Sequence, residues 1–182
     1  MSAARGSGSF RDPSGFVFSA GGGLYRQINT VYKDHFDHLM QSGLYQRLVE
    51  TGRMIPHADA PPELAQSDAA YRVIQPEVVP FISYPYEWCF SQLKDAALAT
   101  LDIQQTATEY GMTLKDASAY NIQFVKGKPL LIDTLSFEKY AEGTPWIPYK
   151  QFCQHFLAPL ALMSHLSPPA TAMASSTALA PA

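Results

Sequence analysis

The sequence has few of the features that mark proteins that bind nucleic acid, cross a membrane or rely on disulfides. No run of lysine and arginine is longer than a pair and the net charge is −3, whereas a nucleic-acid partner requires a basic face. The two cysteines, Cys89 and Cys153, have no metal-ligand spacing and are typical of reduced thiols. The apolar run FLAPLALM is too short to cross a membrane, and the N-terminus has no apolar signal segment. We therefore expect a soluble, cytoplasmic protein whose partners are neither nucleic acid nor a membrane.

A chain of 182 residues with 47% hydrophobic side chains is long enough for one domain with a buried core. Residues 1–14 are rich in glycine and serine, and residues 166–182 contain only Ala, Ser, Thr, Pro, Leu and Met, so we expect both ends to be disordered. Residues 15–165 would then form one folded module. The change of composition near residue 165 fits either an ordinary tail or a lost coding frame that truncates the protein. Both hypotheses stay open, and sequencing the gene through this point would separate them.

The spacing of apolar residues and glycines predicts an α+β protein. We expect two strands around a glycine turn in 15–29, a helix that Gly43 interrupts and Gly52 ends, and a loop over 57–68. The following elements are expected to be strands at 70–75 and 78–84, a helix from Pro85 to Tyr110, a loop over 113–120, strands at 121–125 and 129–133, and a helix over 148–163. The helix that begins at Pro85 should bury one face, formed by Trp88, Leu93, Ala97 and Leu101.

The segment LKDASAYNIQFVKGKPLLIDT, residues 114–134, carries three polar residues suited to phosphoryl transfer. Asn121 follows Asp116 after five residues, and Asp133 comes after the hairpin that the turn KGKP predicts. Phosphoryl transfer needs a carboxylate that orients the attacking hydroxyl, and oxygen ligands that hold Mg²⁺ against the phosphates. Asp116 is the candidate for the catalytic carboxylate, and Asn121 and Asp133 are the candidates for the metal ligands.

Together with the predicted order of elements, these residues resemble the protein-kinase-like fold, nearest to its aminoglycoside and choline phosphotransferase branch. The resemblance covers about residues 15–140. It implies a small sheet lobe, a hinge at VPFISYPYEW, and a helical lobe that is incomplete after residue 163. It also implies ATP with Mg²⁺, and Arg26 and Lys33 are the cations placed to contact its phosphates.

The sequence departs from this family at several positions. Leu114 and Lys115 stand where the family has histidine before the loop aspartate, and Thr134 and Leu135 follow Asp133 in place of Phe-Gly. The glycines at 21–23 favour a plain hairpin turn over a loop that covers phosphates. The alternative is therefore structural: Asp116 caps its loop, Asn121 satisfies backbone groups, and Asp133 pairs with Lys115 or Lys126.

Longer segments resemble the N-terminal part of a bacterial family of class I S-adenosylmethionine-dependent methyltransferases that includes nodulation-associated proteins. These segments are FISYPYEWCFSQLKDAALATL, LKDASAYNIQF, PLLIDTLSFE and YKQFCQHFLAPLAL. The resemblance implies that a methyltransferase domain follows this region in full-length relatives and binds S-adenosylmethionine there. The glycine cluster AGGGLYRQ leads into a strand and not a helix, so we do not expect it to hold that cofactor.

Two functional hypotheses follow from these resemblances. The first is a non-catalytic, kinase-like module whose partner is the missing methyltransferase domain or another protein. The alternative is a fragment of an ATP- and Mg²⁺-dependent phosphotransferase that acts on a small-molecule acceptor.

Three further groups of residues are candidates for a functional site. His35 and His38 lie on one predicted helix face but lack a third metal ligand, and Cys153 with His155 lacks an orienting acid. The aromatic residues Trp88, Trp146, Tyr84, Tyr86 and Tyr149 fit a ligand wall less well than packing between lobes. The final helix is apolar on nearly all sides, which is typical of a helix that other elements bury. Because the helical lobe is incomplete after residue 163, we expect part of this helix to be exposed and to favour association.

Overall fold

The structure is a computed structural model that describes residues 4–5 and 12–166. It confirms the α+β class. Most of the two ends expected to be disordered, 1–14 and 166–182, lie outside the described residues. None of the described helices is both long enough and apolar enough to cross a membrane.

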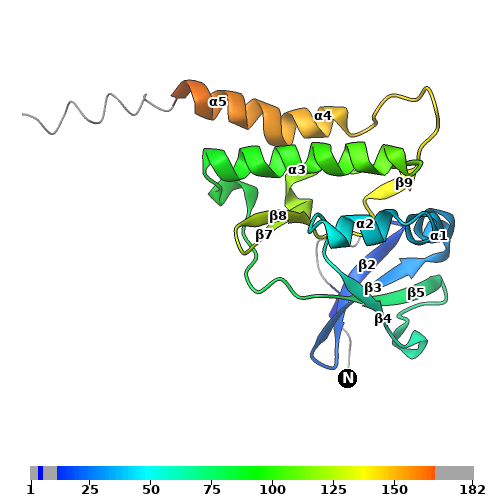
Figure 1. The fold of residues 1–182 in the computed structure, drawn as a ribbon. Helices are drawn as coiled ribbons and strands as arrows, with labels where there is room; N and C mark the ends of the chain where they lie inside the picture. Colours follow the sequence, from blue (N-terminus) through cyan, green and yellow to red (C-terminus); the bar gives the residue numbers. More distant parts are fainter. Residues whose placement is uncertain (1–3, 6–11, 167–182) are drawn as a thin grey trace, which may run out of the picture.

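The first part of the chain forms a small antiparallel sheet with strand order β1-β2-β3-β5-β4. Two short helices lie against this sheet, and an extended connector leaves it along the outside of the molecule (Figure 1). The elements of this part are β1 (Ala4–Arg5), β2 (Gly15–Ala20), β3 (Gly23–Asn29), the 3-10 turn η1 (Thr30–Tyr32), α1 (Lys33–Gln41), α2 (Leu44–Glu50), β4 (His57–Asp59), the turn η2 (Pro62–Leu64) and β5 (Ala70–Pro76).

The second part is built on one long helix, α3, which lies between the two short helices and a final helical segment (Figure 1). The elements are the turn η3 (Pro85–Glu87), α3 (Phe90–Glu109), β6 (Met112–Leu114), the turn η4 (Ala119–Asn121), β7 (Ile122–Val125), β8 (Lys128–Leu131), β9 (Phe137–Lys139), α4 (Tyr149–Phe152), the π-helical turn η5 (Cys153–Leu157) and α5 (Ala158–Leu166). This order of hairpin, helix, strands, connector, long helix, loop and hairpin follows the order expected from the sequence.

Glycines end the elements of the first part as predicted. Gly21 and Gly22 make the turn between β2 and β3 at φ +56° and +82°, and Gly43 separates α1 from α2 at φ +89°. Such values are accessible to glycine without a steric penalty. The glycine cluster is therefore a hairpin turn, as expected.

The predicted strand at 78–84 is wrong. β5 ends at Pro76, and the residues that follow form an extended connector with no strand partner among the described residues. Its large side chains point outward, with Val78 67% and Phe81 75% exposed. Conversely, the predicted loop at 57–68 contains β4, which pairs with β5. The three residues His-Ala-Asp do not alternate between apolar and polar side chains, so their sequence gives no strand signal. They form a strand because they pair with β5.

The long helix α3 buries most of the predicted face: Leu93 and Ala97 are buried, and so is Trp88, just before the helix. Leu101 is 42% exposed, so its assignment to the buried face is wrong. The buried side chains are Leu93, Ala96, Ala97, Ala99, Thr100, Ile103 and Ala107. Four of these are alanines, whose small side chains allow neighbouring elements to approach the helix closely, whereas the sequence pattern favoured the larger leucine. Gly111 ends the helix at φ +71°, as predicted.

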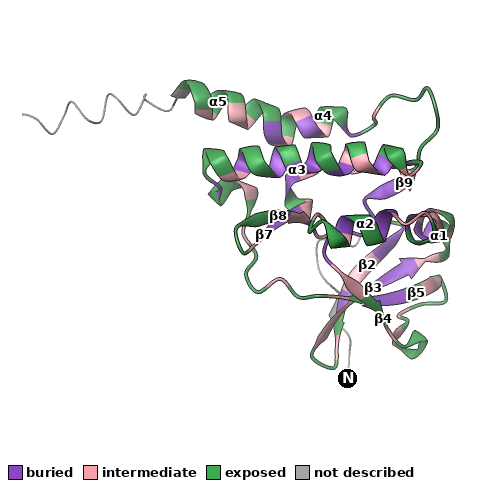
Figure 2. Cartoon of the chain, viewed as in Figure 1, coloured by how far each residue is buried: buried purple, intermediate pink, exposed green. Residues whose placement is uncertain are grey.

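Most of the buried side chains belong to one core around α3, and a second, smaller cluster lies between the sheet and α1 (Figure 2). Leu135 belongs to the second cluster, with Ile28, Tyr32, Phe36 and Ile74. Because Leu135 comes from the segment after β8, it joins the hairpin of the second part to the sheet of the first. The two residues before it are Asp133 and Thr134.

The close packing of β2 against β3 and against Leu135 leaves no room for a side chain at Gly15. A Cβ atom there would lie 2.1 Å from the Gln27 carbonyl oxygen and 2.9 Å from Leu135 Cδ1. We predict that Gly15→Ala lowers the free energy of unfolding by about 3 kcal/mol, because a paired strand cannot move aside. Gly21→Ala is the matched control. Its φ is also positive but nothing lies within 4 Å, so it should cost only about 1 kcal/mol. Urea denaturation of both variants measures this, and equal losses would refute it.

Candidate functional site

Asp133 lies at the junction between the hairpin and the sheet and forms an ion pair with Arg26 of β3. The two side chains are 20% and 13% exposed. Arg26 lies on the same face of its strand as Ile28, which packs in the second cluster with Leu135. The alternation of the strand therefore points Arg26 toward the segment that carries Asp133, across 107 residues of sequence.

Further hydrogen bonds occupy the Asp133 carboxylate. Oδ1 accepts from the Leu135 N–H at 3.0 Å, and Oδ2 accepts from the Ser136 hydroxyl at 3.0 Å. Burial opposes ionisation of this carboxyl, but the Arg26 charge and these donors outweigh it and hold the pKa of Asp133 below its usual value. Asp133 is therefore an ionised carboxylate whose acceptor positions are largely used within the protein.

Ser136 is the residue that brings the three predicted positions together. Its hydroxyl accepts from Asn121 Nδ2 at 3.2 Å while it donates to Asp133. Its carbonyl accepts from the N–H of Lys115, which directly precedes Asp116, at 2.8 Å. Asn121 in turn accepts at its own carbonyl from the Ile132 N–H at 2.8 Å. Asn121 and Asp133 thus share one fully buried serine, and the Asp116 loop is attached to the same residue.

Asp116 has a local role in its loop. Its Oδ1 accepts from the Ser118 N–H at 2.9 Å, two residues on, which is an Asx-turn. The side chain is half-buried. This hydrogen bond is the capping role of the structural alternative for Asp116, and the other carboxylate oxygen makes no hydrogen bond with the described residues.

The other lysines considered near the site have partners elsewhere. Lys33 donates to Asp37 at 2.7 Å, and this hydrogen bond raises the pKa of Lys33. Lys115 donates to Ser14 Oγ at 2.7 Å and lies 4.8 Å from the centroid of the Tyr32 ring. The predicted pairing of Asp133 with Lys115 or Lys126 is therefore wrong, and Arg26 is the partner. The cation that contacts Asp133 lies on the facing side of the sheet and is not one of the lysines near Asp133 in the sequence.

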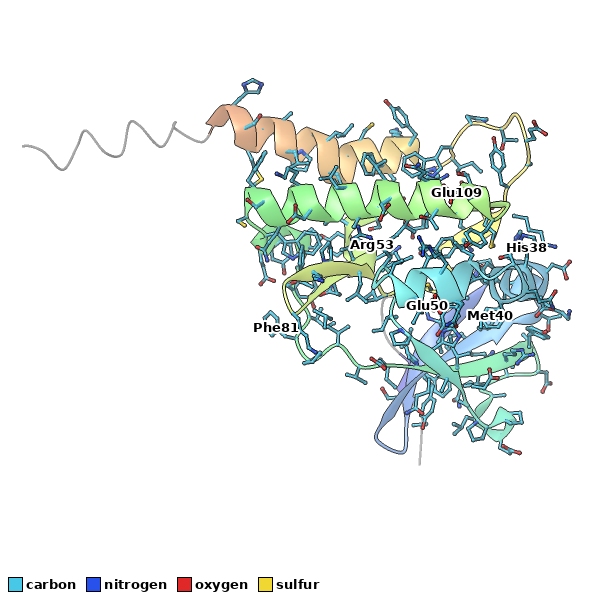
Figure 3. The ribbon with its side chains drawn as sticks, in the orientation of Figure 1. His38, Met40, Glu50, Arg53, Phe81 and Glu109 are labelled. Carbon is cyan, nitrogen blue, oxygen red and sulfur yellow. The ribbon has the colours of Figure 1, made fainter. Side chains whose placement is uncertain are left out.

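The two histidines of α1 do not face one site. His35 Nδ1 accepts from the Lys139 N–H at 3.0 Å, whereas His38 Nε2 contacts the Tyr110 carbonyl at 3.1 Å. Figure 3 shows His38 at the outer end of α1. Among the described residues, no three side chains of His, Cys, Asp or Glu are close enough to hold a metal ion together.

Both tryptophans pack within the core of the second part. Trp88 donates from Nε1 to Ser83 Oγ at 2.9 Å and meets Phe124 edge-on at 5.1 Å. Trp146 donates to the Leu114 carbonyl at 3.2 Å and packs on Phe152. The two tryptophans therefore pack, but within the second part and not between the lobes as predicted. The packing prediction is wrong for the three tyrosines, since Tyr84, Tyr86 and Tyr149 are 44%, 75% and 62% exposed.

The final helical segment holds the Asp116 loop in place, which the sequence did not indicate. Gln151 Oε1 accepts from the Ala117 N–H at 2.8 Å, and His155 Nδ1 lies 3.2 Å from Ser118 Oγ. Both side chains lie on one helix face, four residues apart. Cys153 makes neither of these contacts, so His155 pairs with the loop and not with a thiol.

The residues of the site fit the implied cofactors poorly. Mg²⁺ requires an octahedral set of oxygen ligands, but at Asp133 a cation is already supplied by Arg26 and would have to be displaced. S-adenosylmethionine binding needs a strand, a glycine-rich turn and a helix, whereas the glycines at 21–23 join two antiparallel strands. Neither the paired Asp133 carboxylate nor the glycines at 21–23 therefore offer a ready site for these cofactors.

Asp133 should stabilise the fold through its ion pair. We predict that Asp133→Asn lowers the free energy of unfolding by about 3 kcal/mol at neutral pH, because Arg26 stays behind largely buried and unpaired. Asp95→Asn, on the exposed side of α3, is the matched control and should change it by less than about 0.5 kcal/mol. A neutral result for Asp133→Asn in urea denaturation would contradict the ion pair.

The same carboxylate predicts a pH dependence with a definite sign. The pKa of Asp133 in the fold lies below 3.8, its ordinary value, so the unfolded chain takes up the proton first as the pH falls. Its stabilisation is therefore complete well above pH 3.8 and is lost as the pH falls through 3.8 toward the lowered pKa. Below about pH 5, the free energy of unfolding should fall less steeply with decreasing pH in Asp133→Asn than in the wild type. Equal slopes would show that Asp133 has an ordinary pKa.

No family model matches the sequence. The chain is 41% identical over 162 residues to nodulation protein NoeA of Rhizobium meliloti (strain 1021), a match that covers 88% of this chain and 34% of NoeA. Among solved structures, vaccinia related kinase 3 is similar with a TM-score of 0.45 at 12% identity, over 74% of this chain and 48% of that one. A similarity of that size supports no inference about function. This chain spans about a third of the length of the curated nodulation protein to which it is similar.

Proposed function

We propose that this chain is the N-terminal, kinase-like module of a bacterial S-adenosylmethionine-dependent methyltransferase family, and that it positions an acceptor or a partner without catalysing phosphoryl transfer. The ion pair between Arg26 and Asp133 carries the non-catalytic part of this proposal. It neutralises the carboxylate that a phosphotransferase would offer to Mg²⁺. The similarity to a nodulation protein supports the family assignment.

The methyltransferase chemistry would belong to the other two thirds of such relatives. The hairpin turn at 21–23 does not provide a binding loop for S-adenosylmethionine, so that cofactor would be held outside this module. The partner of the module would be that methyltransferase domain or another protein. Exposed apolar side chains are available for such a contact: Leu157 and Leu162 on the final helical segment, and Ile147 just before it.

One observation favours the alternative, an ATP- and Mg²⁺-dependent phosphotransferase. Asn121 and Asp133 are held by the same serine hydroxyl, so both side chains are near enough to serve one cation if Arg26 moves aside. Asp116 would orient the hydroxyl of a small-molecule acceptor, and Arg26 would then contact a phosphate. Under this alternative, ATP and Mg²⁺ together would compete with the ion pair.

Thermal unfolding with nucleotide separates the two functions. We expect ATP with Mg²⁺ to stabilise the wild type no more than ATP with EDTA, because Arg26 already occupies the carboxylate. A phosphotransferase would instead gain about 2.7 kcal/mol at a hundredfold excess over its dissociation constant. That gain would disappear in Asp133→Ala.

The matched control for this experiment is Asp95→Ala, which alters an exposed carboxylate of α3. It should respond to nucleotide as the wild type does. A Mg²⁺-dependent stabilisation that survives in Asp95→Ala and is lost in Asp133→Ala would overturn the non-catalytic proposal in favour of the phosphotransferase.

A further inference from the structure

A hollow of about 280 Å³ lies where the loop after Asp116, the start of the long helix and the π-helical turn meet. Its walls include Tyr86, Leu93, Tyr120 and His155. Arg26 and Asp133 are not among its lining residues, so the hollow is separate from the ion-paired site. No charged side chain lines it. Its occupant should therefore carry no net charge, because an ion would lose hydration without gaining a counter-charge.

The hydrogen bonds of His155 fix which ring nitrogen carries the proton. The backbone N–H of Ala119 donates to Nδ1 at 3.3 Å, so Nδ1 is an acceptor without a proton. The Ser118 hydroxyl lies 3.2 Å from the same atom, and its oxygen already accepts from the Tyr120 N–H. Its hydrogen is thus directed to Nδ1. Neutral His155 must then carry its proton on Nε2.

The Nε2–H of His155 is consequently a donor without an acceptor among the described residues. No hydrogen bond found among the described residues uses it. The imidazole borders the hollow. A ligand that occupies the hollow can therefore gain a hydrogen bond if it carries an acceptor, without displacing a protein partner.

Two tyrosine rings supply flat surfaces at the mouth of the hollow. Tyr86 is 75% exposed and Tyr120 is 53% exposed. Tyr120 meets the His155 ring edge-on at 6.1 Å, and Tyr86 is stacked in parallel on Tyr84 at 5.4 Å. Rings held in this way lose little conformational freedom when a planar group stacks on them.

An irregular turn in the helix that carries His155 helps to position the residues that line the hollow. The final helical segment opens into a π-helical turn at Cys153–Leu157, and such turns occur often at functional sites. Gln151, one turn earlier, holds the Ala117 N–H and keeps the loop against this helix. The donor and the tyrosine of the loop are therefore fixed relative to one another before any ligand arrives.

We propose that this hollow binds a small, uncharged, planar ring that bears a hydrogen-bond acceptor. The ring stacks against Tyr86 and Tyr120, and its acceptor receives the Nε2–H of His155. A volume of about 280 Å³ is slightly below that of pockets for drug-sized molecules, which suits one ring. This binding does not depend on the proposed function, because it uses none of the residues of the ion-paired site.

Benzamide is a suitable probe, since it joins one planar ring to a carbonyl acceptor. Titration of the full chain, followed by the imidazole signals in NMR spectra, should shift the His155 resonances with a dissociation constant on the order of 1 mM. Toluene has the ring but no acceptor and should bind at least about fivefold more weakly. No shift at His155 up to about 10 mM benzamide, tenfold above the expected dissociation constant, would overturn the proposal.

Variants place the binding at this hollow. Tyr86→Ala and Tyr120→Ala remove exposed rings and should each weaken benzamide binding about fivefold. His155→Phe keeps a ring and removes the donor, so benzamide, followed in this variant by the ring signals of Tyr120, should bind it no better than toluene does. Phe81→Ala is the control: Phe81 is as exposed as Tyr86 but lies out on the connector (Figure 3), and its loss should leave binding unchanged. Binding that persists unchanged in both tyrosine variants would refute the site.

Discussion

The ion pair between Arg26 and Asp133 is the interaction on which the arrangement of the two parts depends. It joins a strand of the sheet to the segment after the hairpin, and Leu135 inserts into the cluster between sheet and helix directly beside it. A charge that is largely removed from water is costly unless it is paired. The hairpin must therefore approach the sheet in the one orientation that brings the carboxylate to the guanidinium, and Ser136 then positions Asn121 and the Asp116 loop around it.

The final helical segment supports this arrangement from the opposite side. Phe152 and Phe156 fill the core around the long helix, while Gln151 and His155 hold the backbone of the loop. One segment thus contributes both apolar burial and polar attachment. Its outward side chains Leu157 and Leu162 remain exposed, as the all-round apolar pattern predicted. The loop that carries Asp116 is consequently held rigidly, whether it serves catalysis or only recognition.

Hydrogen bonds within the protein use most of the acceptor positions of the Asp133 carboxylate. Asp133 accepts from Arg26, Leu135 and Ser136, and the Asn121 amide donates to the same serine. The Arg26 side chain is 13% exposed and pairs with Asp133. A divalent cation at this carboxylate would therefore have to displace the guanidinium.

The sequence by itself determined the class of fold, the glycine-ended elements and the three positions at 116, 121 and 133, because these depend on local periodicity, turn residues and spacing. It did not determine the partner of Asp133: Lys115 and Lys126 are close in sequence, whereas Arg26 is close only after the strand alternation turns it toward the hairpin. Nor did it indicate β4, the exposed connector or the hydrogen bonds of Ser136 with Asn121, Asp133 and Lys115. Each of these features depends on which other segment of the chain lies next to it. Only the tertiary structure decided these features, because pairing between separate segments, whether 15 or 107 residues apart, follows from the packing of whole elements and leaves no local pattern in the chain.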